Sequence, residues 1–144
     1  MANEPISKSN RERLKELYHQ YNLHKDEDIF RHKKFGYVMI TKSGIEKIMA
    51  QDQINVTFVP EKIFEDQDGN CKGCIVKATA MKNDVKIETF GTATKDNCQS
   101  TYYMEMAEKR SKARCVLQLT SFSSLGVFSD VEADEWNINH KSNA

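Results

Sequence analysis

Four basic side chains are crowded into six consecutive residues in the last third of this 144-residue chain. They are Lys109, Arg110, Lys112 and Arg114. On a helix of about 3.6 residues per turn, the two lysines share one face and the two arginines share another. Ammonium and guanidinium groups bind phosphate and carboxylate groups, so these residue types and spacings indicate anion binding.

Arg110 is the unusual member of this cluster. It lies between Met106 and Ala113, within the apolar stripe of the helix that we expect over residues 102–119. A guanidinium group in such a stripe is costly unless it is paired or faces an anion. The sequence leaves two alternatives open for Arg110: a buried ion pair with a carboxylate, or a contact to a nucleic-acid phosphate.

The lysines of the cluster also have a purely structural interpretation. Glu105 and Glu108 precede Lys109 and Lys112 by four residues, which is the spacing of ion pairs along one helix face. A solvated face of paired charges needs no ligand.

Other familiar site patterns fail when their residues are inspected. The segment 36–43 approaches a phosphate-binding loop, but Thr41 replaces the second glycine and the residues between favour a strand. Asp66 and Asp68 resemble the start of a calcium loop that lacks its bidentate glutamate. The four histidines have no nucleophile or carboxylate at a catalytic spacing. We therefore expect no enzyme, cofactor or metal site, and an enzyme with an unrecognised site is the weakest alternative.

The four cysteines include a C-x-x-C pair, Cys71 and Cys74, which is typical of zinc or redox sites. Their segment favours a strand, where an odd separation sends the two side chains to opposite faces. No second pair of ligands completes a tetrahedral set. We expect Cys71, Cys74, Cys98 and Cys115 to be reduced, structural thiols.

The overall composition is that of one globular domain. Apolar residues make up 39% of the chain, and 21 Lys and Arg balance 21 Asp and Glu. Any binding of nucleic acid must therefore come from clustered charge rather than from net charge. No apolar run approaches the roughly 20 residues that span a bilayer, and no signal peptide is recognisable at the first residues. We expect a cytoplasmic protein with no membrane partner.

Hydrophobic periodicity and turn residues predict the elements that position these side chains. We expect an α+β fold: an antiparallel β-meander of three to four strands with the long basic helix packed across one face, plus an N-terminal helix. Residues 1–9 and 137–144 are expected to be flexible, with a single domain over residues 10–136 and a polar connector over residues 22–34. The expected helices are 10–21, 45–51 and 102–119, with Asn10 as the first cap, and the expected strands are 35–40, 54–58 with an extension to 64, 74–81 and 85–94.

Four segments in this order resemble the single-strand annealing proteins of phages and mobile elements, a superfamily that includes Erf, Redβ, RecT and the eukaryotic Rad-type annealing rings. That family shows T-K-x-G before a helix, an A-T-A-like strand, a glycine near a strand end, and a helix of the A-E-K-R type. The corresponding segments here, within residues 36–135, are ITKSGIEKIM (40–49), CIVKATA (74–80), IETFGTATKDN (87–97) and MEMAEKRSKARCVLQL (104–119). The chain departs from the family in its short length and in Ser111, where small apolar residues are common.

The resemblance implies a single-stranded DNA-binding and annealing protein of homologous recombination and DNA repair. It would act without ATP, assemble into homo-oligomeric rings or filaments, and have an exonuclease or a single-strand-binding protein as a further partner. A basic groove between sheet and helix would hold the phosphate backbone, with aromatic side chains stacking on bases. The implied contacts are Lys95, Lys109, Arg110, Lys112 and Arg114, with Lys33, Lys34 and Lys42, and stacking by Tyr102, Tyr103 and either Phe35 or Tyr37.

Two further expectations concern the acidic residues and the alternative function. The acidic segment 130–135 would either dock on the basic face of a neighbouring protomer or shield the groove when DNA is absent. The alternative to DNA annealing is a protein–protein interaction module, a mobile-element accessory or anti-host factor, whose basic helix meets an acidic partner.

Overall fold

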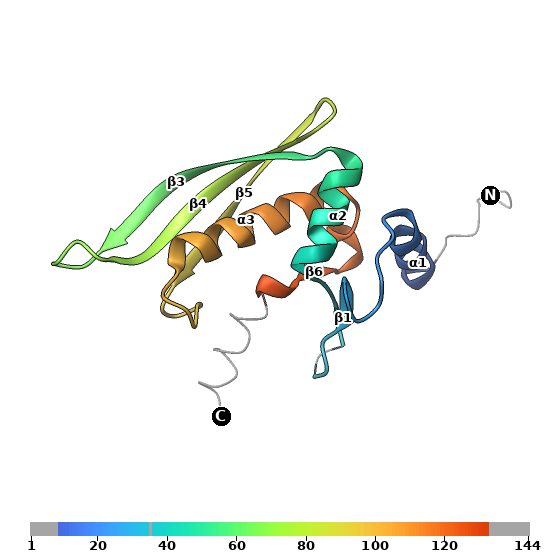
Figure 1. Ribbon diagram of the computed structural model, residues 1–144, viewed down its shortest axis with the longest axis horizontal. Coiled ribbons are helices and arrows are strands. Elements are labelled where there is room, and N and C mark those ends of the chain that lie inside the picture. Colours follow the sequence, from blue (N-terminus) through green and yellow to red (C-terminus); the bar gives the residue numbers. More distant parts are fainter. Residues whose placement is uncertain (1–8, 35, 133–144) are drawn as a thin grey trace, which may run out of the picture.

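The computed structural model describes residues 9–34 and 36–132 (Figure 1). The expected flexible tail over residues 137–144 lies outside this part of the chain, as does the expected flexible N-terminus except for Ser9. Among the described residues, no helix is long and apolar enough to cross a membrane.

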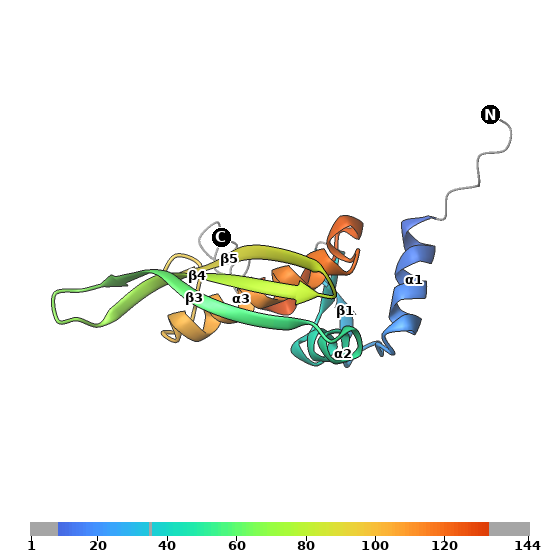
Figure 2. The same ribbon diagram turned by 90° about the horizontal axis from the view of Figure 1, so that it is seen from above.

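A three-stranded antiparallel sheet and one long helix form the main layer of the molecule. The strands β3 (Asn55–Glu65), β4 (Cys71–Lys82) and β5 (Val85–Thr94) are consecutive neighbours, and the helix α3 (Tyr103–Leu119) lies along one face of their sheet (Figures 1 and 2). This arrangement confirms the predicted α+β fold, with three strands in the meander. The strand β3 continues past Pro60 through a register shift, as the extension to residue 64 predicts.

The alternation of small apolar residues explains why α3 can pack on this sheet. In β4, every second residue from Cys74 to Ala80 is fully buried, and the residues between are partly exposed. Gly91 of β5 is the point of closest approach: a Cβ atom there would lie 2.2 Å from the carbonyl oxygen of Ala107 and 2.7 Å from the backbone nitrogen of Ser111. Only glycine permits this contact between strand and helix backbones.

A second, smaller sheet was not predicted from the sequence. It contains β1 (Ile29–Arg31), β2 (Val38–Ile40) and β6 (Phe128–Ser129), with β1 antiparallel and β6 parallel to the central β2. The prediction of an unstructured polar connector over residues 22–34 is therefore wrong for β1. Strands of two or three residues are too short to show a hydrophobic period, and these depend on partners distant in sequence.

Two shorter helices complete the fold. The helix α1 (Asn10–Gln20) is capped by Ser9, whose hydroxyl accepts a hydrogen bond from the Glu12 backbone nitrogen at 3.2 Å, so the prediction of Asn10 as the cap is wrong by one residue. The helix α2 (Lys42–Asp52) begins three residues earlier than predicted because Thr41 caps it, accepting from the Gly44 nitrogen at 3.3 Å.

The buried Asp28 fixes α2 to the chain just before β1. Its side chain is 1% exposed and accepts hydrogen bonds from the Lys47 ammonium at 2.6 Å, from the His24 backbone nitrogen at 2.9 Å, and from the Ser43 hydroxyl. Burial alone would raise the pKa of Asp28, but these donors hold it below the ordinary value. The ionised carboxylate therefore anchors the helix that faces α3.

Candidate functional site

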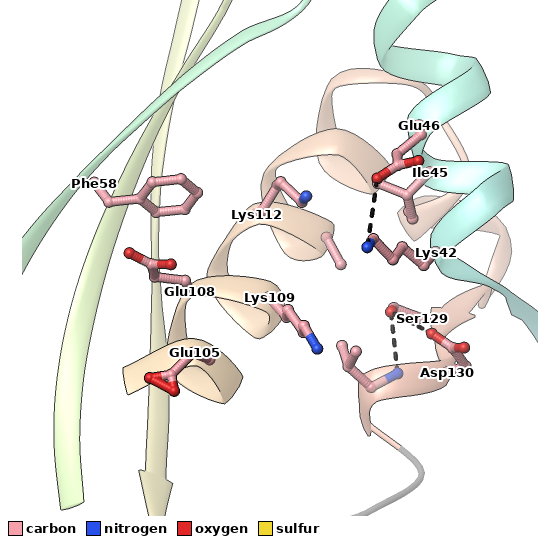
Figure 3. Close-up of a pocket in the computed structure, with 12 residues that line it drawn as sticks. Lys42, Ile45, Glu46, Phe58, Glu105, Glu108, Lys109, Lys112, Ser129 and Asp130 are labelled. Carbon is pink, nitrogen blue, oxygen red and sulfur yellow. Dashed lines mark hydrogen bonds and ion pairs between the residues drawn. The ribbon is translucent and has the colours of Figure 1, made fainter. Parts of the chain in front are cut away.

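A groove of about 450 Å³ lies between α2 and α3 (Figure 3). Phe58 of β3 and Ile45 of α2 give it an apolar lining, and residues 129–131 border it on a third side. The 3-10 turn η2 (Asp130–Glu132) contributes the last two of these residues. The groove is thus built from four separate elements, which the packing of α2 and α3 brings together.

Three lysines from two helices line this groove. Lys42 is the first residue of α2, and Lys109 and Lys112 come from α3 (Figure 3). Lys42 forms a long ion pair with Glu46, at 3.9 Å, between side chains that are both more than half exposed. Within the described residues, neither Lys109 nor Lys112 forms an ion pair, although the spacing of the helix predicts partners four residues earlier. Their ammonium groups are available to an anion.

Carboxylates line the same groove, so its charge is mixed. They belong to Glu46, Glu105, Glu108 and Asp130. Asp130 lies close to Lys109 in charge terms: burial raises the pKa of Asp130, while the Ser129 hydroxyl, nearby backbone groups and the Lys109 charge offset part of that rise. A ligand in the groove therefore meets both signs of charge.

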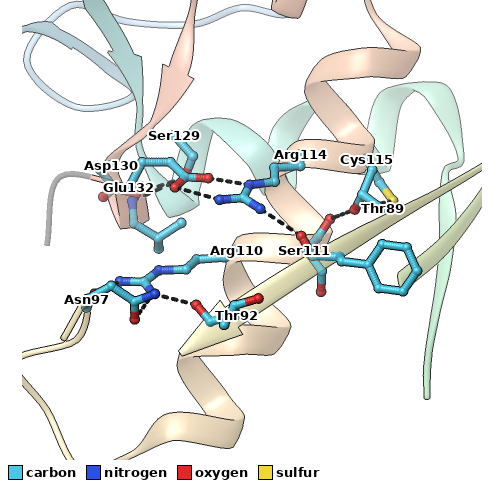
Figure 4. A network of polar contacts seen from close by, with 12 residues as sticks. Thr89, Thr92, Asn97, Arg110, Ser111, Arg114, Cys115, Ser129, Asp130 and Glu132 are labelled. Atoms are coloured by element: carbon cyan, nitrogen blue, oxygen red, sulfur yellow. Dashed lines mark hydrogen bonds and ion pairs between the residues drawn. The ribbon is translucent and has the colours of Figure 1, made fainter. Parts of the chain in front are cut away.

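Arg110 does not reach the groove, because its side chain is fully buried on the other side of the helix (Figure 4). Its Nη1 donates to the Thr92 carbonyl at 2.8 Å and to the Asn97 side-chain oxygen at 3.0 Å, and its Nη2 donates to the Asn97 carbonyl. Of the two alternatives from the sequence, burial is the one observed. The partners among the described residues are carbonyl oxygens rather than the expected carboxylate. As placed here, Arg110 cannot contact a phosphate.

Arg114 is held in a similar way one turn later. Its Nε and Nη2 form a bidentate ion pair with Glu132, at 2.7 and 3.1 Å, and its Nη1 donates to the Phe90 carbonyl at 2.7 Å (Figure 4). Phe90 and Thr92 are two residues apart on β5, so their carbonyls point to the same side of the strand. Arg114 and Arg110 therefore bind successive carbonyls along the outer edge of β5, which in the described sheet pairs only with β4.

The other predicted contacts are scattered over the molecule. Lys95 is exposed in the loop between β5 and α3, and Lys33 and Lys34 are exposed in the turn between β1 and β2. None of these three lines the groove. Of the predicted contacts, the structure brings together Lys42, Lys109 and Lys112 in the groove.

The predicted stacking residues differ in their exposure. Tyr102 is 71% exposed at the start of α3, whereas Tyr103 is 8% exposed and belongs to the core. Tyr37 packs against His32 and Phe128, with ring centroids 5.5 and 5.3 Å apart. Phe35 lies outside the described residues. Only Tyr102 combines high exposure with proximity in sequence to the lysines.

The sequence analysis missed the partners of these basic residues. Phe58 and Ile45 looked like ordinary core positions, and nothing in the local pattern singles out Glu132 as the partner of Arg114. The acidic run after Ser129 was the one available signal, because an acidic segment that follows a basic helix can fold back onto it.

No metal or redox site accompanies the groove in the described part of the chain, where no three His, Cys, Asp or Glu side chains are grouped as a metal ion requires. Cys74 is fully buried and Cys71 is exposed, so the two side chains of the C-x-x-C pair differ in environment as predicted. Burial raises the pKa of the Cys74 thiol to about 11, which makes it a poor metal ligand or nucleophile.

Comparisons of the chain with protein-family models, with curated proteins and with solved structures give no match.

Proposed function

We propose that this protein binds single-stranded nucleic acid by its phosphate backbone in the groove between α2 and α3. The observation that carries this proposal is the convergence of Lys42, Lys109 and Lys112 from two helices, with two of the three ammonium groups making no ion pair within the described residues. Lysine is a common phosphate ligand, and a row of such charges tracks a backbone without reading base sequence. Tyr102, exposed at the start of α3, supplies a candidate surface for base stacking.

The annealing activity is the part of the proposal that rests on the resemblance to single-strand annealing proteins. A strand held by its phosphates keeps its base edges open to a complementary strand. Pairing and stacking of two strands release about 1.4 kcal/mol per base step, so annealing needs no ATP. A homo-oligomeric ring or filament, a cytoplasmic location and a recombination partner such as an exonuclease belong to the same proposal.

The test is a fluorescence-anisotropy titration of the full chain with a labelled oligothymidylate at several salt concentrations. Because log affinity falls with log salt by about 0.7 per phosphate neutralised on single strands, three lysines predict a slope near −2. The double variant Lys109→Ala/Lys112→Ala should lower the affinity and reduce this slope by about 1.4. Stability should be unchanged, since neither lysine makes an ion pair within the described residues.

The matched control is Lys33→Ala/Lys34→Ala, which removes the same formal charge from a turn that does not line the groove. This control should leave the slope unchanged. An equal loss in both double variants would point to diffuse attraction rather than a site. A folded sample that fails to bind at low salt would contradict the proposal.

A second candidate function is a protein–protein interaction module, and the mixed character of the groove favours it. Ile45, Phe58 and Val131 give it an apolar lining, and carboxylates alternate with the lysines. Peptide-binding surfaces commonly combine an apolar centre with a polar rim. A folded protein that ignores oligonucleotides, yet binds acidic peptides with loss of affinity in the Lys109→Ala/Lys112→Ala variant, would establish this alternative.

A further inference from the structure

Residues 128–132, which we call the strap, lie between two hollows on the surface of α3. On one side is the groove, to which the strap contributes Ser129, Asp130 and Val131. On the other side is a hollow of about 150 Å³, lined by Arg114 together with Phe128, Ser129 and Glu132. The strap therefore separates Arg114 from the lysines of the groove.

Few polar contacts hold the strap in place. Its strand β6 has two residues, which pair with Met39 and Ile40 of β2. Beyond this pairing, the bidentate ion pair from Glu132 to Arg114 is its main attachment to α3 (Figure 4). Two-residue parallel pairings contribute little by themselves, so the ion pair has a large share in fixing the segment.

The strap places one carboxylate beside each kind of basic residue on α3. Glu132, with a side chain 10% exposed, binds the Arg114 guanidinium, and Asp130 lies next to Lys109 at the groove. A phosphate group presents oxygens to a guanidinium fork in much the same geometry as a carboxylate. The strap thus occupies donors that a nucleic-acid backbone would use.

We propose that the strap is an intramolecular competitor of the nucleic acid, and that a bound strand displaces Glu132 from Arg114. This inference rests on the function proposed above. Displacement would remove the wall between the two hollows and join Lys42, Lys109, Lys112 and Arg114 into one basic surface. Arg114 would keep its place because Nη1 donates to the Phe90 carbonyl, while Nε and Nη2 become available to a phosphate.

The energetics follow from a two-state strap. Apparent affinity is the affinity of the open state reduced by the fraction of molecules that are open. Weakening the ion pair increases that fraction, so it strengthens binding even though no residue that touches the nucleic acid is changed. The released arginine also adds one phosphate contact to the interface.

The test compares Glu132→Gln with Glu88→Gln in the full chain, using anisotropy titrations with labelled oligothymidylate across salt. Glu88 pairs with Lys77 on β5, so its variant changes the net charge equally without touching the strap. Relative to this control, Glu132→Gln should bind at least about threefold more tightly, and its salt slope should be steeper by about 0.7. Circular dichroism checks that both variants are folded.

A second measurement needs no variant. Hydrogen exchange of the wild-type chain, read by mass spectrometry on peptides that cover residues 126–132, should become faster when oligothymidylate is added. Direct binding of the strand on a closed strap would instead slow this exchange or leave it unchanged, and that result would overturn the inference even if Glu132→Gln fails to fold.

The outcomes separate the inference from the proposed function. If the wild type binds, but Glu132→Gln matches Glu88→Gln or binds more weakly, and exchange is not accelerated, the strap is structural and the proposed function stands. If neither the wild type nor Glu132→Gln binds at low salt, both proposals fail. Weak wild-type binding with tight binding by Glu132→Gln supports both.

Discussion

The arginines and the lysines of α3 are interleaved within six residues, yet the structure gives them opposite surroundings. Arg110 and Arg114 bind carbonyls along the edge of β5, whereas Lys109 and Lys112 line the groove towards α2. With about 100° per residue, the arginines lie about 40° apart and the lysines about 60° apart, and the two pairs point about 150° away from each other. A basic cluster in sequence is therefore two separate surfaces in space.

The choice of side chain matches these two surroundings. An arginine presents several donors in a planar fork, which suits the carbonyls at a strand edge and the carboxylate of Glu132. A lysine is a single mobile charge and binds phosphate without fixed geometry. The comparison teaches that the density of positive charge on a helix is no measure of its binding surface, because half of that charge here stabilises the fold.

The largest expected effect comes from breaking the arginine side of this comparison. Arg110→Ala would leave the Thr92 and Asn97 carbonyls without their donor in a buried place and would open a cavity. We expect it to lower the free energy of unfolding by about 3 kcal/mol or more, measured by urea denaturation. The neighbouring variant Lys109→Ala should stay within about 0.5 kcal/mol of the wild type. An Arg110→Ala protein with wild-type stability but weakened oligonucleotide binding would show that Arg110 belongs to the binding surface after all.

An intermediate effect is expected where α3 touches the sheet. Gly91→Ala places a Cβ atom against the helix backbone at Ala107 and Ser111, which cannot move aside as a side chain would. The helix must shift away from β5, which weakens the reach of both arginines, and we expect a loss of about 1–3 kcal/mol in the free energy of unfolding.

The control for this variant is Thr92→Ala, whose side chain points to the opposite face of the sheet, and it should cost less than about 1 kcal/mol. If thermal or urea unfolding shows equal losses for the two variants, the close approach at Gly91 is not what sets the position of α3.

The sequence predicted the parts of the fold that repeat. The alternation in β4 and the long helical period of α3 are visible without a structure, and Arg110 within the apolar stripe correctly raised the alternative of burial. The small sheet was missed because β1 and β6 have too few residues to show a period.

The partners of the basic residues could not be predicted in the same way. Glu132 lies 18 residues from Arg114, and Asn97 lies 13 residues from Arg110. Each of these contacts depends on how a turn returns the chain to the helix, and no local pattern specifies that path. The helical spacing separates lysines from arginines, but only tertiary packing decides which pair faces the sheet edge and which faces the groove.

The smallest expected effect lies where the strap meets the lysines. Burial raises the folded-state pKa of Asp130 above its unfolded value, and the Lys109 charge offsets only part of this shift. A raised carboxyl pKa contributes stability that is fully present below the unfolded value of about 3.9 and is lost as the pH rises through the folded value. Asp130→Asn should therefore increase the free energy of unfolding by about 0.5 kcal/mol at pH 7 and give no gain near pH 3.5. Urea melts of both proteins at the two pH values measure this difference. If Asp130→Asn is destabilising at pH 7, the attraction between Asp130 and Lys109 outweighs the cost of burial, and the lysine side of α3 holds a structural ion pair as the arginine side does.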